Sequence, residues 1–128
     1  MKILLDTHIW LWAYLEPRRL GSTLLRELRN QGNELWLSPI STWEALTLHS
    51  KGRIQLPSDL DHWLWNATLA TREAPLTHEI ALAASRLPLH PDPADRLLAG
   101  TALVLDLVLA TADQRLLGLG EIRTFANR

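Results

Sequence analysis

The sequence predicts an α/β fold in which helices cover both faces of a small parallel sheet. Short apolar runs alternate along the chain with longer segments of helical spacing. The two clearest strand candidates are Lys2–Leu5, which is continuously apolar from Ile3 on, and Leu107–Ala110, which is apolar throughout, as is typical of strands buried on both faces. Alternation of strands and helices favours βαβ units. We therefore expect a three-layer α/β/α sandwich with four or five parallel strands.

The elements follow one another in a regular order. The strand Lys2–Leu5 precedes a helix whose apolar positions begin at Ile9, and Thr23–Asn30 has the spacing of an amphipathic helix. The segment Ala74–Leu76 could form a short strand or a loop. The other expected elements are a strand at Glu34–Leu37, helices at Ser41–His49, Asp59–Ala70, His78–Leu87 and Asp92–Leu105, and strands at Leu107–Ala110 and Ile122–Phe125.

Composition narrows the class of protein. A chain of 128 residues that is 47% hydrophobic and 21% charged fits one domain over residues 1–128. The absence of cysteine excludes disulfides and thiolate metal sites. The net charge of −1 argues against binding of nucleic acid through bulk charge, but not against an enzyme that meets phosphates through metal ions. With no leader and no apolar run of membrane-spanning length, we expect a cytoplasmic protein without membrane contact.

Acidic residues recur at the ends of predicted strands and the starts of the helices that follow. The carboxyl ends of parallel strands meet at one edge of a sheet, which is where open α/β sheets bind ligands. Acids far apart in the sequence are therefore expected to converge there. The candidates are Asp6, Glu44, Asp95 and Asp113, with Asp92 as a second candidate beside Asp95.

Each acid also has a structural explanation. Asp6 and Asp113 suit helix N-caps, and Asp92 does so with Pro93 at the first helical position. The spacing from Ser41 to Glu44 fits a capping box. Capping explains each acid singly, but it does not explain why all of them fall at the same end of the expected elements.

Converging carboxylates point to a metal site. Their mutual repulsion in a cleft destabilises the fold unless a cation compensates it. Oxygen ligands without cysteine suit Mg²⁺ or Mn²⁺. Such ions activate water and stabilise phosphate oxyanions, so the pattern indicates metal-dependent hydrolysis of phosphodiester bonds.

Four segments in sequence order carry a family resemblance: LLDTHIWLW, SPISTWEA, HPDPADRLLAGTAL and LATADQRL. In order and spacing they resemble a PIN domain, and more narrowly the VapC-type toxins of bacterial toxin–antitoxin pairs. The resemblance spans nearly the whole chain. It implies a small parallel sheet sandwiched by helices, Mg²⁺- or Mn²⁺-dependent cleavage of RNA, a cognate antitoxin protein as partner and a homodimer.

Motif by motif, the resemblance implies that Asp6, Glu44, Asp95 and Asp113 are the catalytic acids and metal ligands. Asp92 belongs to a DPxDR variant of the third motif. Leu116 stands where the family often has an aromatic residue.

Three polar residues beside these acids are further candidates. Thr7 and Thr111 could hold Asp6 or a metal-bound water, or could cap helices. Arg96 could contact RNA phosphate or lie solvated along its helix. The five histidines, His8 and His90 among them, lack the spacing of a zinc site, and we expect polar or surface roles for them.

Two W-x-W pairs, Trp10/Trp12 and Trp63/Trp65, lie in predicted helices. Residues two apart point about 200° away from each other, so one member of each pair should be partly exposed and could contact a partner. We expect the antitoxin to cover the helices that carry these pairs.

Other functions fit the sequence less well. A signalling receiver domain needs an acidic pair near the first strand and a late lysine, but position 7 is Thr7 and the only lysines are Lys2 and Lys51. A haloacid-dehalogenase-like phosphatase needs Asp where His8 stands. A catalytically inert binding module would use the acids only as caps, and would be expected to lack at least one of them.

Overall fold

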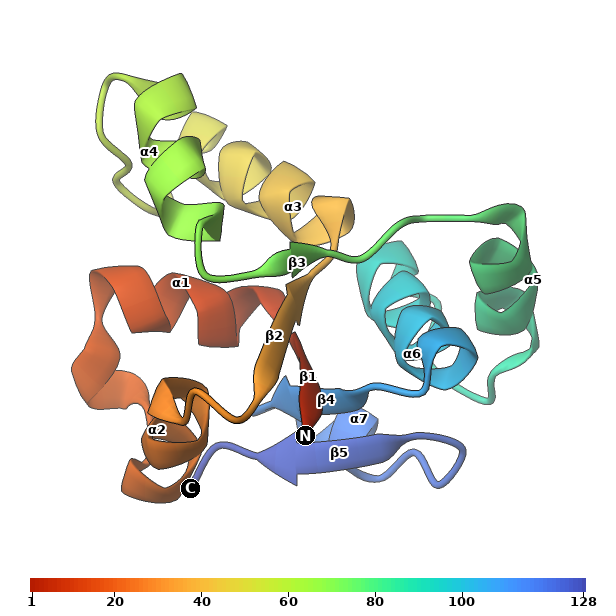
Figure 1. Ribbon diagram of the computed structural model, residues 1–128. Coiled ribbons are helices and arrows are strands. Elements are labelled where there is room, and N and C mark those ends of the chain that lie inside the picture. Colours follow the sequence, from red (N-terminus) through yellow and green to blue (C-terminus); the bar gives the residue numbers. More distant parts are fainter.

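The computed structural model describes all 128 residues and contains a five-stranded sheet in the order β3-β2-β1-β4-β5 (Figure 1). Every neighbouring pair of strands is parallel. The predicted fold class is confirmed, with the larger of the two expected strand numbers. The strands are β1 (Lys2–Leu5), β2 (Glu34–Leu37), β3 (Arg72–Glu73), β4 (Val108–Thr111) and β5 (Arg123–Ala126).

Helices connect the strands and cover both faces of the sheet. Figure 1 shows α5 and α6 side by side as a hairpin, while α3 and α4 extend past β3. No helix is long and apolar enough to cross a membrane. The helices are α1 (Thr7–Leu15), the short 3₁₀ helix η1 (Pro17–Arg19), α2 (Ser22–Arg29), α3 (Pro39–Ser50), α4 (Leu60–Thr68), α5 (His78–Arg86), α6 (Pro93–Leu105) and α7 (Gln114–Leu117).

The two hydrophobic cores lie on opposite faces of the sheet, because successive strand side chains point to opposite sides. Ile3 and Leu5 of β1 belong to a cluster that includes Trp10 of α1. Leu4, between them, belongs to a second cluster with Leu98 of α6. This arrangement explains why β1 has no polar residue among its last three positions.

The strand register brings the polar residues after β1 and β4 together. Leu5 pairs with Ala110, and the next amide, Asp6 N–H, donates to the Ala110 carbonyl at 3.0 Å. Thr111 therefore lies beside Asp6 at the carboxyl edge of the sheet. On the other side of β1, Ser38 follows β2 and begins α3.

The strand at the β3 edge differs from expectation. Pairing involves Arg72 and Glu73, whereas Ala74–Leu76 was the expected strand or loop. The Ala74 N–H still donates to the Leu37 carbonyl at 2.8 Å, and the ladder stops there because Pro75 has no N–H to donate. The apolar run in this segment is too short to locate the strand from the sequence alone.

The tryptophan pairs divide as expected between core and surface. Trp10 is fully buried, and its indole N–H donates to the Ala67 carbonyl at 2.8 Å, while Trp12 is half-buried. In α4, Trp63 is buried and Trp65 is 68% exposed. Exposed aromatic surface therefore remains on α4.

Candidate metal-binding active site

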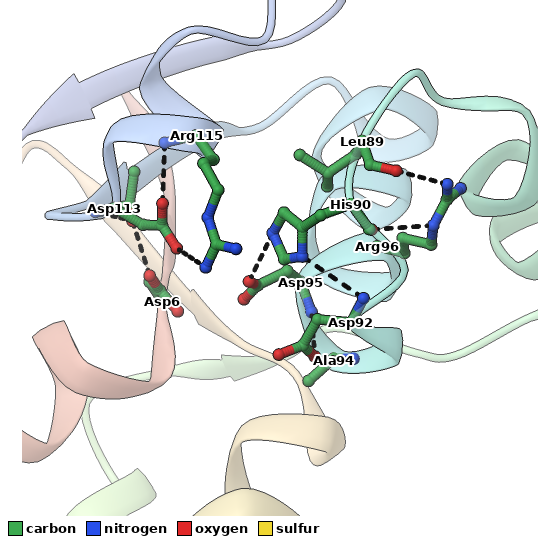
Figure 2. Close-up of polar contacts among 10 residues, drawn as sticks. Asp6, Leu89, His90, Asp92, Ala94, Asp95, Arg96, Asp113 and Arg115 are labelled. Carbon is green, nitrogen blue, oxygen red and sulfur yellow. Dashed lines mark hydrogen bonds and ion pairs between the residues drawn. The ribbon is translucent and has the colours of Figure 1, made fainter.

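A cleft of about 400 Å³ opens at the carboxyl edge of the sheet and contains all five acids singled out from the sequence. Figure 2 shows Asp6 and Asp113 on one side of this cleft, with Asp92 and Asp95 at the start of α6 on the other. Its lining residues are Asp6, His8, Trp12, Glu44, Asp92, Asp95, Ala112, Asp113 and Arg115.

Asp6 is held by two hydrogen bonds at the junction of β1 and α1. Its Oδ1 accepts from the Thr7 N–H at 2.7 Å, and its Oδ2 accepts from the Thr111 hydroxyl at 2.6 Å. The Thr111 hydroxyl oxygen in turn accepts from the Asp113 N–H at 3.0 Å. Burial raises the pKa of Asp6 above its ordinary value, although these hydrogen bonds act in the opposite direction.

Glu44 lies in the second turn of α3 and contacts the start of α1. The Thr7 hydroxyl donates to Oε1 of Glu44 and also lies 2.9 Å from the Ser41 hydroxyl. Burial raises the pKa of Glu44, and the charges of Asp6 and Asp92 add to the increase. The Thr7 hydroxyl thus holds Glu44, a contact that the sequence did not suggest beside the roles it left open for Thr7, which were holding Asp6 or a metal-bound water and capping a helix.

The capping box expected between Ser41 and Glu44 does not form. Helix α3 begins at Pro39, two residues before the predicted start at Ser41, because Ser38 is its N-cap and accepts from the Ile40 N–H at 3.1 Å. This displacement frees the Glu44 carboxylate from helix capping and allows it to face Thr7.

Asp92 and Asp95 form the opposite side of the cleft. Asp92 caps α6, accepting from the Ala94 N–H at 3.0 Å, with Pro93 as the first helical residue. Asp95 is in the first turn of α6, and its pKa is raised to about 7. Burial is the main cause, and the charges of Asp92, Asp6, Asp113 and Glu44 follow.

Asp113 caps the short helix α7, accepting from the Arg115 N–H at 2.8 Å. The Arg115 guanidinium also lies 3.3 Å from Oδ2 of Asp113. Burial alone would raise the pKa of Asp113, but the hydrogen bonds and the charge of Arg115 outweigh it and lower the pKa. Arg115, which the sequence analysis did not single out, is the one arginine that lines the cleft, and no lysine does so.

His90 is a second residue of the site that the sequence did not reveal. Its Nε2 lies 3.1 Å from Oδ2 of Asp95, but the pair is not aligned as a hydrogen bond and Nε2 is buried without a partner. One ligand atom each from His90, Asp95 and Asp113 lies within 4.8 Å of the others. The only sequence signal was its position two residues before the helix cap Asp92.

The Arg96 side chain binds backbone carbonyls at the end of α5 and in the loop between α5 and α6. Its guanidinium donates to the carbonyls of Ala84, Leu87, Leu89 and His90, at 2.5–3.1 Å. Figure 2 shows this side chain turned away from the acids. Arg96 therefore holds the loop that carries His90, whereas the sequence left open a contact with RNA phosphate or a solvated position along the helix.

The donors of the cleft fit a hard divalent cation. Asp6, Glu44 and Asp95 have raised pKa values because burial and mutual repulsion disfavour their charged forms. His90 does not line the cleft, but one of its ring nitrogens lies within 4.8 Å of carboxylate oxygens of Asp95 and Asp113. Carboxylate oxygens that lack a compensating cation are what Mg²⁺ and Mn²⁺ bind.

Known proteins share this chain's sequence and fold. Residues 3–122 match the family model of the PIN domain. Over 116 residues the chain is 34% identical to Ribonuclease VapC22 of Mycobacterium tuberculosis (strain ATCC 25618 / H37Rv), covering 89% of this chain and 88% of that protein.

Solved structures extend the likeness to the fold. VapBC2 from Rickettsia felis, bound to a promoter DNA fragment, has a TM-score of 0.77 at 16% identity, covering 98% of each chain. DNA-bound VapBC from Salmonella typhimurium has a TM-score of 0.72 at 16% identity, covering 100% of this chain and 99% of that one. The family match, the related ribonuclease and the shared architecture agree, and the chain belongs to the PIN domain family.

Proposed function

We propose that this chain is a metal-dependent endoribonuclease and the toxin of a toxin–antitoxin pair, acting as one domain over residues 1–128 in the cytoplasm. The observation that carries the proposal is the convergence of Asp6, Glu44, Asp95 and Asp113 from four separate parts of the chain on one cleft. The related Ribonuclease VapC22 supports RNA as the substrate.

The proposed metal ligands are the same four acids, with Mg²⁺ or Mn²⁺ as the ion and Asp92 as an alternative ligand. When bound, the ion supplies a lowered pKa for a coordinated water and neutralises charge on the phosphate oxygens. Thr111 orients the Asp6 carboxylate, and Thr7 orients Glu44. These hydroxyls fix the acids before substrate arrives, which lowers the entropy cost of assembling the site.

The contacts of the acids favour this proposal over an inert binding module. Helix capping accounts for Asp6, Asp92 and Asp113, which are the N-caps of α1, α6 and α7. It does not account for a Glu44 carboxylate that caps nothing, nor for the burial and the neighbouring negative charges that together raise the pKa of Asp95 to about 7. A fold gains nothing from this repulsion unless a cation relieves it.

We further propose that a cognate antitoxin covers the surface between α3 and α4, and that the chain forms homodimers. A cavity of about 390 Å³ there is lined by apolar residues including Leu46 and Leu64, with the exposed Trp43 at its rim. Trp65 adds exposed aromatic area on the same helix pair. The neighbouring structures of VapBC assemblies support a protein partner.

RNA cleavage by the purified protein tests the enzymatic proposal. Cleavage should require Mg²⁺ or Mn²⁺, stop in EDTA, and be lost in Asp6→Asn, because that change removes a charged ligand while keeping its shape. Glu121→Gln, which removes an exposed carboxylate outside the cleft, is the matched control and should cleave like the wild type. Undiminished cleavage by Asp6→Asn, or by the wild type in EDTA, would refute the mechanism.

A pull-down with the cognate antitoxin tests the partner surface. Trp43→Ala and Trp65→Ala remove exposed indoles and should weaken binding without loss of RNA cleavage. Trp63 is part of the core, so its replacement would report on folding instead. Unchanged antitoxin binding in both exposed variants would place the partner elsewhere.

A further inference from the structure

A second groove, distinct from the α3–α4 surface, continues from the acidic cleft along α1. It has a volume of about 340 Å³ and shares two lining residues, His8 and Trp12, with the cleft. The groove and the cleft therefore adjoin at His8 and Trp12. The groove is also lined by the apolar residues Leu11, Leu15, Leu48 and Ile54 and by the charged residues Glu16, Arg19 and Arg53.

The groove combines flat π surfaces with positive charge. The Arg19 guanidinium lies over the Trp12 ring, 4.5 Å from its centroid, and the His8 ring lies 5.8 Å from that of Trp12. Proteins that bind single-stranded RNA stack unpaired bases on aromatic rings and on guanidinium planes of this kind. The groove's volume falls in the range of about 300–1,000 Å³ of small-ligand pockets, enough for one nucleotide.

Charge in the groove complements a phosphate backbone. Arg53 is exposed and makes no ion pair or side-chain hydrogen bond. Arg19 has one weak ion pair, with its Nη1 3.8 Å from Oε2 of Glu16. In the acidic cleft, by contrast, the one arginine, Arg115, is already paired with Asp113. Arginine side chains that are free to attract RNA therefore lie outside the cleft, and this groove, which carries Arg19 and Arg53, adjoins it.

We propose that the groove formed by His8, Trp12, Arg19 and Arg53 is a nucleotide subsite for single-stranded RNA next to the scissile phosphate. A base stacks on the Trp12–Arg19 platform, and Arg53 contacts a backbone phosphate. The inference rests on the proposed ribonuclease function, and it assigns to this groove part of the substrate affinity and of the choice of cleavage site.

Two variants with matched controls test the subsite. Trp12→Leu keeps apolar volume against the core but removes the π face, and Trp12→Phe restores a π face. Arg53→Gln removes the free charge, with Arg26→Gln, an exposed arginine on α2 away from the cleft, as its control. The probe is a short fluorescein-labelled single-stranded RNA of mixed sequence. Its binding is measured by anisotropy in EDTA, and the KM and kcat of its cleavage in Mg²⁺.

Stacking predicts a defined loss of affinity. Trp12→Leu should raise the Kd and KM by about 5- to 140-fold, the equivalent of about 1–3 kcal/mol per stacked base. Trp12→Phe should recover most of that loss. Arg53→Gln should reduce the slope of log K against log salt by about 0.7, as expected for one lost phosphate contact on a single strand. Arg26→Gln should leave Kd, KM and salt slope unchanged.

The outcomes separate this subsite from the proposed activity. A wild-type protein without metal-dependent cleavage overturns the ribonuclease function and the subsite with it. Wild-type cleavage with unchanged Kd, KM and salt slope in Arg53→Gln and Trp12→Leu overturns the subsite alone. If Trp12→Leu unfolds, the exposed Arg53 decides the question. Loss of antitoxin binding with RNA binding retained would assign the groove to the protein partner and also overturn the proposal.

Discussion

Replacement of Asp95 by asparagine should stabilise the metal-free protein, although it removes a proposed ligand. The pKa of Asp95 is raised from its ordinary value of 3.8 to about 7, and its side chain is only 16% exposed. Because the folded state binds this proton more tightly than the unfolded chain, stability falls as pH rises between these two values. Above pH 7 the charged carboxylate destabilises the fold, and an amide of the same shape does not.

The magnitude follows from the two pKa values. At about 1.4 kcal/mol per pKa unit, a difference of about 3 corresponds to a penalty of about 4 kcal/mol at pH 8. At pH 5 the penalty is less than half as large, because Asp95 is then protonated in the folded state and the pH is only about one unit above the ordinary pKa of 3.8. Asp95→Asn should therefore raise the free energy of unfolding more at pH 8 than at pH 5.

Urea unfolding followed by circular dichroism measures this difference in EDTA at both pH values. Glu121→Gln controls for the loss of one exposed carboxylate and should change stability by less than about 0.5 kcal/mol. Saturating Mg²⁺ should stabilise the wild type more than Asp95→Asn, since the ion removes the repulsion that the variant lacks. If Asp95→Asn destabilises the metal-free protein at pH 8, the reasoning about the cleft is wrong.

Three further outcomes are expected. At subsaturating Mg²⁺, the rate of RNA cleavage should decline as pH falls through about 7, because protons compete with the ion for Asp95. Added Mg²⁺ should move the midpoint of this decline to lower pH. Arg96→Ala should lower the free energy of unfolding in urea by about 2–4 kcal/mol, because it leaves four loop carbonyls without a charged donor. Gly100→Ala should cost about 1–3 kcal/mol in the same assay, since its Cβ would lie 2.9 Å from the Ile80 carbonyl oxygen and 3.0 Å from Ala84. Equal stability of either variant and the wild type would contradict the packing described.

The sequence predicted the central strands because their apolar runs are long enough to signal burial on both faces. It also predicted where the acids lie, since Asp6 and Asp113 follow such strands directly. Strand β3 was misplaced because two residues, Arg72 and Glu73, carry no hydrophobic pattern, and only pairing with β2 defines them.

The contacts within the α5–α6 loop and the start of α6 were not predictable in the same way. His90 has no metal-site spacing to any other histidine, and it reaches Asp95 only because the α5–α6 loop folds back on itself. The conformation of this loop depends on hydrogen bonds from Arg96 to backbone carbonyls. Because every residue has a carbonyl group, the sequence does not show which of them Arg96 contacts. The position of the α3 N-cap at Ser38 likewise determines that Glu44 contacts Thr7 and does not cap the helix. Helix boundaries inferred from a sequence are uncertain by one or two residues, so this contact was not predictable.

The two sides of the cleft belong to different parts of the fold, and this has a mechanical consequence. Asp6 and Asp113 extend from strand ends in the middle of the sheet, whereas Asp95 belongs to the α5–α6 hairpin and depends on its loop. An ion shared by Asp6 and Asp95 would act as a reversible cross-link between hairpin and sheet. The α5–α6 hairpin would then move most slowly when the cleft holds an ion. The metal concentration would therefore determine the rigidity of the molecule as well as its RNA cleavage.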